Sequence, residues 1–298
     1  MRYRWFVSIA IPLVAAWSPL APPPPDVASA PSGPWRDQIH NVPMRDKDGA
    51  SHDLYTRICR PPGETPARVV VIAHGSPANA NARPAMQPAQ CDNEGVRWFL
   101  ARGYIAVMGM RRGYGPTGGT WAETAGPGCP AEGYARGGRE TARDLDALVS
   151  YATSLPFARP DGAVVVGQSA GGWGADAYNS LPHPKVVAMV SMAGGRGGHV
   201  DNTPNKNCRP DELARAAGLL GGTATTPMLW VYAANDSFFD PALAVAMHTA
   251  FTRAGGKAIL FQPGPFGSDG HGLFFGRGGS NVWGPEMARY LTSRGAGP

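Results

Sequence analysis

Short runs of apolar, β-rich residues recur along the chain, and helix-like stretches separate them. The later apolar runs are predicted strands, at residues 68–74, 104–110, 163–167, 186–192, 228–233 and 257–262. Several are continuously apolar rather than alternating, which is typical of strands buried on both faces of a parallel sheet. Two earlier segments, 39–44 and 53–60, predict a leading antiparallel hairpin that turns at residues 46–49.

The stretches between the strands carry helical patterns. They predict helices at residues 93–101, 132–154, 173–181, 210–220 and 241–254. In the second of these, apolar residues recur at helical spacing and charged residues lie largely opposite. The alternation predicts the α/β class, with a doubly wound, mostly parallel sheet flanked by helices. Since no internal repeat or second domain is visible, residues 31–298 are expected to form one domain.

Composition sets wider limits. A chain of 298 residues with 43% hydrophobic content can bury one full core. The net charge is +5, but no run of Lys or Arg exceeds a pair, so no nucleic-acid-binding arm is predicted.

The N-terminus has the pattern of an export signal. Arg2 and Arg4 precede an apolar segment, 5–17, and small residues follow. The segment is shorter than a membrane-spanning helix needs, although an uncleaved anchor is the alternative. A signal peptide and proline-rich linker are therefore predicted over residues 1–30. The mature chain is expected to be secreted or periplasmic, without stable membrane insertion.

Export bears on the cysteines, because an oxidising compartment lets them pair. The chain has Cys59, Cys91, Cys129 and Cys208, and none forms a C-x-x-C motif, so zinc is not expected. Cys91 and Cys129 lie in segments that should emerge at the same edge of the sheet. A Cys91–Cys129 bridge is predicted, which leaves Cys59 with Cys208, and free buried thiols are the alternative.

A candidate nucleophile lies between a predicted strand and a predicted helix. Residues 167–172 read Gly-Gln-Ser-Ala-Gly-Gly, with the apolar run 163–166 before them. This order is typical of a nucleophile elbow, in which small residues two positions either side of the serine allow the sharp turn that exposes its hydroxyl. Ser169 is therefore predicted to be a nucleophile.

Partners for Ser169 are expected beyond the carboxyl ends of other strands. Asp236 follows the strand 228–233, and His271 lies in a Gly-rich loop after the strand 257–262. The order Ser, Asp, His is the one that a hydrolase sheet requires. His271 is predicted to accept the Ser169 proton, and Asp236 to hold the imidazole tautomer.

Two other acids lie near these positions. Asp240 is the alternative to Asp236, because it follows the same strand. Asp269 is predicted to form a turn, since it lies too near His271 in sequence to approach from a separate strand.

The turn 74–77, His-Gly-Ser-Pro, closes the strand 68–74. It can aim the backbone N–H of Ser76 at a substrate carbonyl oxygen, and the N–H of Ala170, directly after the nucleophile, would be the second donor. Ser76 and Ala170 are therefore the predicted oxyanion hole.

These features together resemble a known family. The motifs that carry the resemblance are HGSP (74–77), MRRGYGPTGG (110–119), GQSAGGWG (167–174), AGGRGGH (193–199), NDSFF (235–239) and DGHGLFF (269–275). They are similar to exported α/β-hydrolases of the dienelactone hydrolase-like group. The resemblance implies the α/β-hydrolase fold, a Ser169, Asp236, His271 triad and hydrolysis of acyl esters. Dienelactone hydrolases proper use a cysteine nucleophile, so the lactone substrate does not transfer with the fold.

Further residues are expected near the substrate. Arg196, flanked by glycines after the strand 186–192, is predicted to meet an anionic substrate group, with loop bracing or solvent exposure as alternatives. Trp173 and Phe238 are predicted to line an apolar acyl or aryl pocket, with core packing as the alternative. Arg112 is expected to brace loops.

The remaining histidines show no ligand spacing, so neither a metal nor another cofactor is expected. The predicted function is a serine esterase that cleaves a small-molecule carboxylic ester through an acyl-enzyme. The alternatives are a prolyl-oligopeptidase-like peptidase, an acyltransferase and a non-catalytic binding protein on a hydrolase scaffold. Nothing in the sequence predicts the oligomeric state, the particular ester or a lid.

Overall fold

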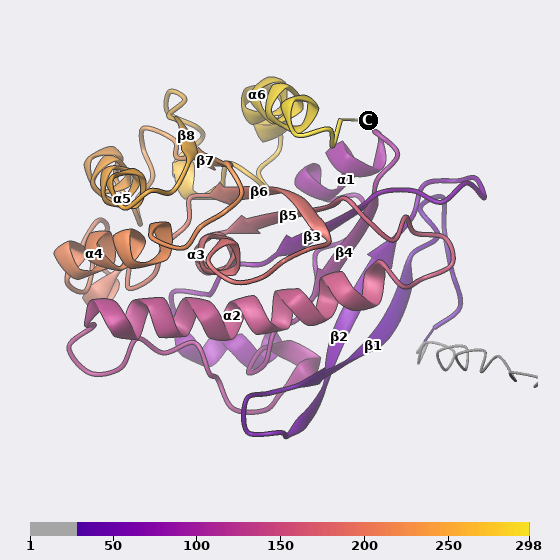
Figure 1. The fold of residues 1–298 in the computed structure, drawn as a ribbon, viewed down its shortest axis with the longest axis horizontal. Coiled ribbons are helices and arrows are strands. Elements are labelled where there is room, and N and C mark those ends of the chain that lie inside the picture. The colour runs from indigo at the N-terminus through magenta and orange to yellow at the C-terminus, as the bar shows by residue number, and fades with distance from the viewer. Residues whose placement is uncertain (1–28, 298) are drawn as a thin grey trace, which may run out of the picture.

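One eight-stranded sheet runs through the computed structural model, which describes residues 29–297 (Figure 1). The strand order is β1-β2-β4-β3-β5-β6-β7-β8. Strands β1 and β2 form an antiparallel hairpin, β2 pairs antiparallel with β4, and the other pairs are parallel. The bounds are β1 Gln38–Arg45, β2 Ser51–Cys59, β3 Val69–Ala73, β4 Ile105–Gly109, β5 Ala163–Gln168, β6 Val186–Met192, β7 Met228–Val231 and β8 Ala258–Phe261. Each overlaps a predicted strand, and the predicted fold class is confirmed.

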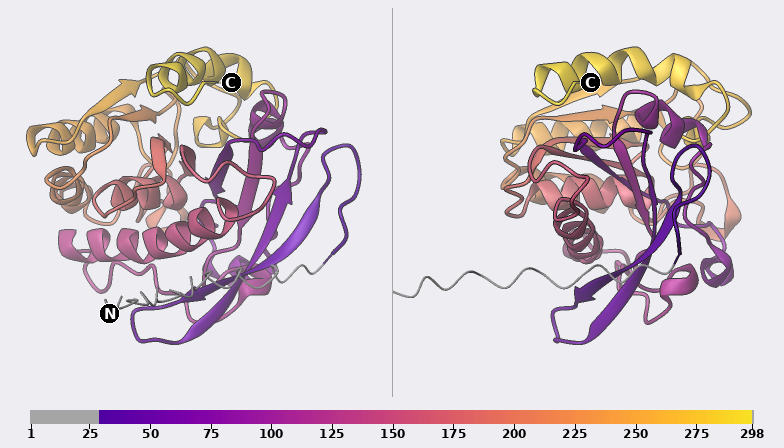
Figure 2. Two further views of the ribbon diagram at one scale, coloured as in Figure 1. Left: turned by 45° about the vertical axis from the view of Figure 1, so that its right-hand side comes forward. Right: turned by 90° about the vertical axis from the view of Figure 1, so that its right-hand side faces the viewer.

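Helices cover both faces of the sheet (Figures 1 and 2). One face packs against α1 (Glu94–Leu100) and α6 (Gly279–Ser293). The other packs against α2 Ala131–Ala152, α3 Ala170–Asn179, α4 Pro210–Gly221 and α5 Pro241–Arg253. Short 3₁₀ helices lie in the connections, at η1 Ala80–Ala85, η2 Gly115–Thr117, η3 Val200–Asn202 and η4 Gly270–Gly272.

The two-sided cover explains the continuously apolar strands. In β3, Val69 and Val71 belong to the core beneath α2, whereas Val70 and Ile72 belong to the core beneath α1 and α6. All four side chains are at most 1% exposed. Burial of each such side chain contributes roughly 1.5–3 kcal/mol, so the inner strands form a rigid base for the loops at their ends.

Helix α6 was not predicted from the sequence. It contains Gly284 and Pro285, and both residues disfavour helix interiors. Tertiary packing outweighs this propensity, because Trp283, Met287 and Leu291 are fully buried against the sheet. Helix α3 also begins earlier than predicted, directly after Ser169.

The predicted cysteine pairing is wrong. The bridges are Cys59–Cys91 and Cys129–Cys208, and the described residues hold no free cysteine. Cys91 belongs to the core on the α1 and α6 face, whereas Cys129 packs against the core on the α2 face. The sheet separates these two cysteines, so emergence at the same edge was not enough to bring them together.

The predicted export segment, residues 1–30, lies outside the described residues except for its last two positions. Within residues 29–297, no helix combines the length and the apolar character that crossing a membrane would require.

Candidate active site

Ser169 occupies a sharp turn between β5 and α3. Its backbone has φ 56° and ψ −122°, a conformation that costs a residue with a side chain about 1–3 kcal/mol. Two backbone hydrogen bonds tie the turn to β6 and the loop after it: Ser169 N donates to Met192 O at 2.9 Å, and Gly195 N donates to Ser169 O at 3.2 Å. A Cβ on Gly171 would lie 2.4 Å from the Ala73 oxygen, so the close approach of α3 to β3 requires glycine there. This is the geometry of a nucleophile elbow.

The Asp236 carboxylate binds the His271 ring. Nδ1 of His271 lies 3.0 Å from Oδ1 and 3.2 Å from Oδ2 of Asp236, whose side chain is fully buried. Oδ1 also accepts the backbone N–H groups of Phe238, at 2.8 Å, and Phe239, at 3.0 Å. These donors fix the carboxylate, and the carboxylate in turn sets the orientation of the imidazole.

The other two acids in these loops have different partners. Asp240 caps α5, accepting the Leu243 N–H at 2.8 Å. Asp269 caps η4, accepting the His271 backbone N–H at 2.9 Å, and it binds the Ser237 hydroxyl at 2.6 Å. Asp269 thus forms the turn expected of it, and only Asp236 among the three reaches the His271 ring in the described part of the chain.

The His271 loop lies against the elbow. The side-chain amide of Gln168, the residue before Ser169, donates to the His271 carbonyl at 3.1 Å. The Phe238 ring stacks on the His271 ring, with centroids 4.1 Å apart. Within residues 29–297, no hydrogen bond joins the Ser169 hydroxyl to His271; such bonds are often long before a substrate is bound.

A cavity of about 290 Å³ opens in front of Ser169. Ser169 lines it together with four other predicted site residues, Ser76, Ala170, Arg196 and Phe238. The turn that carries Ser76 contacts the elbow directly, because a Cβ on Gly75 would lie 3.0 Å from the Ser169 Cβ. The cavity therefore brings Ser169, the predicted nucleophile, together with both predicted oxyanion donors.

Trp173 does not line this cavity, so that prediction is wrong. Its side chain is fully buried in the core on the α2 face, and its Nε1 donates to the Tyr134 carbonyl at 2.9 Å. One turn into α3, residue 173 faces α2 rather than the elbow opening, and core packing, the alternative considered, is what the structure has.

Arg196 lines the cavity, but Glu123 holds its guanidinium. Nη2 lies 2.7 Å from Oε2 of Glu123 and 2.8 Å from the Thr141 hydroxyl, while Nη1 donates to the Glu123 carbonyl at 3.1 Å. Both terminal nitrogens are thus used within the protein. Loop bracing replaces the predicted contact with an anionic substrate group. Arg112 also braces, pairing with Asp144 and Glu140.

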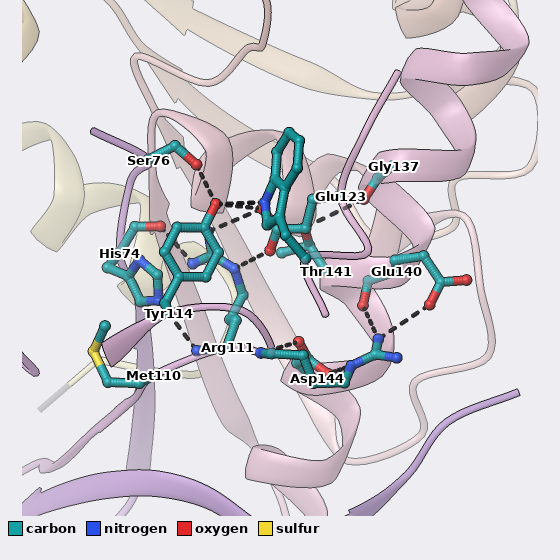
Figure 3. Close-up of polar contacts among 12 residues, drawn as sticks. His74, Ser76, Met110, Arg111, Tyr114, Glu123, Gly137, Glu140, Thr141 and Asp144 are labelled. Carbon is teal, nitrogen blue, oxygen red and sulfur yellow. Dashed lines mark hydrogen bonds and ion pairs between the residues drawn. The ribbon is translucent and has the colours of Figure 1, made fainter. Parts of the chain in front are cut away.

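Glu123, which was not predicted as a site residue, is the centre of a buried polar network (Figure 3). It also pairs with Arg111, whose Nη1 donates to the His74 carbonyl at 2.5 Å. The Tyr114 hydroxyl donates to Glu123 Oε2 at 2.9 Å and hydrogen-bonds the Ser76 hydroxyl. The network thus ties the turn of Ser76 to the loop of Arg196, on two sides of the cavity.

Burial and the neighbouring guanidinium groups set the protonation states of Glu123 and His74. Burial alone would raise the pKa of Glu123, but the guanidinium groups of Arg111 and Arg196 outweigh burial and hold that pKa well below its usual range. Burial and the nearby Arg111 lower the pKa of His74 to about 3, so His74 is neutral at physiological pH. Its Nε2 accepts the Arg111 backbone N–H at 3.2 Å.

A signal for Glu123 did exist in the sequence. It is the only charged residue between positions 113 and 131, a stretch rich in glycine and proline. A lone charge in such a loop is a candidate for a buried ion pair, because a charge that becomes buried on folding requires a partner.

No protein-family model and no curated protein sequence matches the chain. Its structure is similar to an acetyl xylan esterase from Paenibacillus sp. R4, with a TM-score of 0.61 and 16% identity over 92% of this chain and 89% of that one. It is similar to a proposed dienelactone hydrolase from Klebsiella pneumoniae, with a TM-score of 0.54 and 14% identity over 86% of this chain and 98% of the other.

A third similar structure is the acylaminoacyl peptidase from Pyrococcus horikoshii, with a TM-score of 0.56 and 14% identity. The match covers 86% of this chain and only 40% of the peptidase. Likeness at these identities establishes the fold, and the α/β-hydrolase fold implied by the resemblance is confirmed.

Proposed function

We propose that the protein is a serine esterase in which Ser169, His271 and Asp236 form the catalytic triad. The observation that carries the proposal is the His271–Asp236 hydrogen bond, formed in loops that lie against the strained elbow of Ser169. Esterases among the structures of similar fold support the hydrolase class.

In the proposed reaction, Ser169 Oγ attacks the ester carbonyl carbon while Nε2 of His271 accepts the hydroxyl proton. The tetrahedral intermediate collapses, the C–O bond to the alcohol breaks, and His271 returns the proton to the leaving alkoxide. Water then attacks the acyl-enzyme by the same route and releases the acid and the free serine. Asp236 keeps the Nδ1 proton of His271 in place and stabilises the imidazolium.

The backbone N–H groups of Ser76 and Ala170 would stabilise the oxyanion. Neutral His74 and the Glu123 network support this role, because they hold the Ser76 turn through Arg111 and Tyr114. Loss of one oxyanion donor typically costs about 10²–10³ in kcat.

A fluorophosphonate probe tests the proposal. It should label the wild-type protein at one serine, which peptide mass mapping should assign to Ser169, and it should not label Ser169→Ala. A folded wild-type protein that resists the probe would remove the serine-hydrolase assignment and leave a binding protein on a hydrolase scaffold.

Product analysis separates the remaining activities. An esterase releases acid from p-nitrophenyl esters, with a rate that varies along an acyl-length series. An acyltransferase forms a second ester when an alcohol or sugar acceptor is added, and a peptidase cleaves the matching p-nitroanilides at comparable rates.

We also propose that the chain works outside the cytoplasm, in the periplasm or after secretion. Both disulfides support this compartment, because such bonds persist where the environment is oxidising. The export pattern at residues 1–30 supports it from the sequence.

A further inference from the structure

Arg83 lines the same cavity as Ser169, yet its guanidinium forms no hydrogen bond or ion pair with any residue that the structure describes. Arg83 lies in η1 and is half-buried. Its Nε is buried without a hydrogen bond, and no carboxylate within residues 29–297 forms an ion pair with the side chain. Like Glu123, Arg83 is a lone charge in its loop, the only one between positions 75 and 91.

An aromatic platform holds this guanidinium in place. The Arg83 guanidinium carbon lies 3.6 Å from the centroid of the Trp121 ring. Trp121 is itself fixed, because its Nε1 donates to the Tyr114 hydroxyl at 3.0 Å. A guanidinium stacked on an indole keeps its N–H donors in its own plane, where they remain free to bind a carboxylate with two parallel hydrogen bonds.

No carboxylate among the described lining residues neutralises the positive charge of Arg83. Among the residues that the structure describes, Glu123 is the only acid that lines the cavity, and Arg111, Arg196 and Tyr114 already donate to it. Two guanidinium groups therefore share one carboxylate before Arg83 is counted. The wall carries excess positive charge in a partly enclosed space, and such a site favours an anionic ligand.

We propose that Arg83, stacked on Trp121, is a carboxylate subsite, and that the ester cleaved at Ser169 carries a free carboxylate group. This inference rests on the proposed function and adds the substrate class. The carboxylate belongs to the acyl part or to the alcohol part of the ester, and the experiment has one arm for each.

Paired esters, in which one member carries a carboxylate where the other carries a methyl group, test the inference. For the acyl side, monomethyl adipate is compared with methyl hexanoate; for the alcohol side, 4-acetoxybenzoate is compared with p-tolyl acetate. In at least one pair, the wild-type kcat/KM should favour the carboxylate by about 10-fold or more, as a charge-assisted hydrogen bond implies. Arg83→Gln should abolish that preference, because kcat/KM for the carboxylate ester should fall by about 10-fold or more relative to kcat/KM for its neutral partner.

Two further variants sharpen the test. Arg83→Lys should recover only part of the preference, because an ammonium keeps the charge without the planar pair of donors. Arg97→Gln changes an exposed arginine of α1 that lies outside the lining of this cavity, and it should leave the preference intact. Equal kcat/KM for both members of both pairs in the wild type, or an unaltered preference in Arg83→Gln, would overturn the subsite.

Binding measurements distinguish this inference from the proposed function. Calorimetric titration of Ser169→Ala with monomethyl adipate and with 4-acetoxybenzoate should detect binding that the additional change Arg83→Gln weakens about 10-fold or more. Such binding without ester hydrolysis by the wild type would retain the subsite and reject the esterase. Hydrolysis of neutral esters without Arg83-dependent binding would retain the esterase and reject the subsite.

Discussion

The Asp236 carboxylate and the His271 imidazole are joined at 3.0 Å through Nδ1, although 34 residues separate them along the chain. Asp236 lies in the loop after β7 and His271 in the loop after β8, so two neighbouring parallel strands bring the two side chains to one edge of the sheet. The bond leaves Nε2, the opposite ring nitrogen, free to act on a serine hydroxyl.

Removal of the nucleophile or the base should nearly abolish activity. Ser169→Ala and His271→Ala are each expected to reduce kcat by roughly 10⁴–10⁶-fold, and the double variant should be no slower than either, because each change disables the same unit. Steady-state kinetics on a p-nitrophenyl ester, with circular dichroism to verify folding, measures this. Multiplicative losses in the double variant would mean that the two residues act independently.

A matched pair of acids tests the third member. Asp236→Asn should lower kcat by about 10⁴-fold, because an amide stabilises the wrong imidazole tautomer. Asp240→Asn should leave kcat unchanged, since the Asp240 carboxylate caps α5, whereas the His271 ring is bound by Asp236. The assignment of the acid would be reversed if the Asp240 variant were inactive and the Asp236 variant active.

Glu123 should make the protein sensitive to acid. Its folded pKa is held below the ordinary value, so its contribution to the free energy of unfolding is complete above the unfolded value of about 4.3 and is lost as pH falls below it. Glu123→Gln leaves two buried guanidinium groups without a carboxylate and should cost about 3–5 kcal/mol at pH 7.

Urea unfolding between pH 3 and pH 7 measures that contribution. The difference between wild type and Glu123→Gln should narrow as the pH falls. The control is Glu64→Gln, in which an exposed ion pair with Arg36 is lost and stability should hardly change. A constant difference across the pH range would contradict the assigned ionisation of Glu123.

The two disulfides should differ in their effect on activity. Replacing either pair by alanine is expected to cost about 2–5 kcal/mol, with the Cys129–Cys208 pair the more costly by about 1 kcal/mol because it closes the longer loop. Cys129 lines the cavity, and Cys208 N donates to the carbonyl oxygen of Gly197, another lining residue, at 2.8 Å. Loss of this bridge, but not of Cys59–Cys91, should therefore also raise KM. Thermal melts and ester kinetics on both double variants measure this. An equal change of KM in both variants would show that the Cys129–Cys208 bridge has no particular role in shaping the cavity.

Export can be tested by intact mass. The mature protein recovered from an exporting host should begin between Trp17 and Pro31, and its mass should increase on reduction as both bridges open. Retention of Met1 together with unbridged cysteines would reject the proposed compartment.

The strands could be predicted because their signal is local. Each inner strand is a continuous apolar run, and burial on both faces requires that pattern wherever the strand lies in the sheet. Helix α6 could not be predicted in the same way. Its Pro285 and Gly284 oppose a helix locally, and only the contacts of Trp283 and Met287 with the sheet outweigh them.

The same distinction between local signals and contacts made by the whole fold applies to the candidate site. Ser169, Asp236 and His271 each follow a strand, so their positions could be derived from strand order. The partners of Arg196 and Arg83 could not, because Glu123 and Trp121 come from a loop whose path depends on the whole fold. The cysteine pairing failed for this reason too, since the sequence gives the edge at which a segment emerges but not the face on which it packs.

At residue 169, conformational stability and catalysis favour different amino acids, because the backbone conformation suits glycine whereas the proposed reaction needs the serine hydroxyl. A glycine there would adopt φ 56° without a Cβ penalty, whereas Ser169→Ala would keep the strain. Ser169→Gly should therefore unfold at a higher temperature than Ser169→Ala while remaining equally inactive. A population of variants selected for thermal resistance alone would drift toward glycine at residue 169, and the reactive hydroxyl would persist only under continuous selection for turnover.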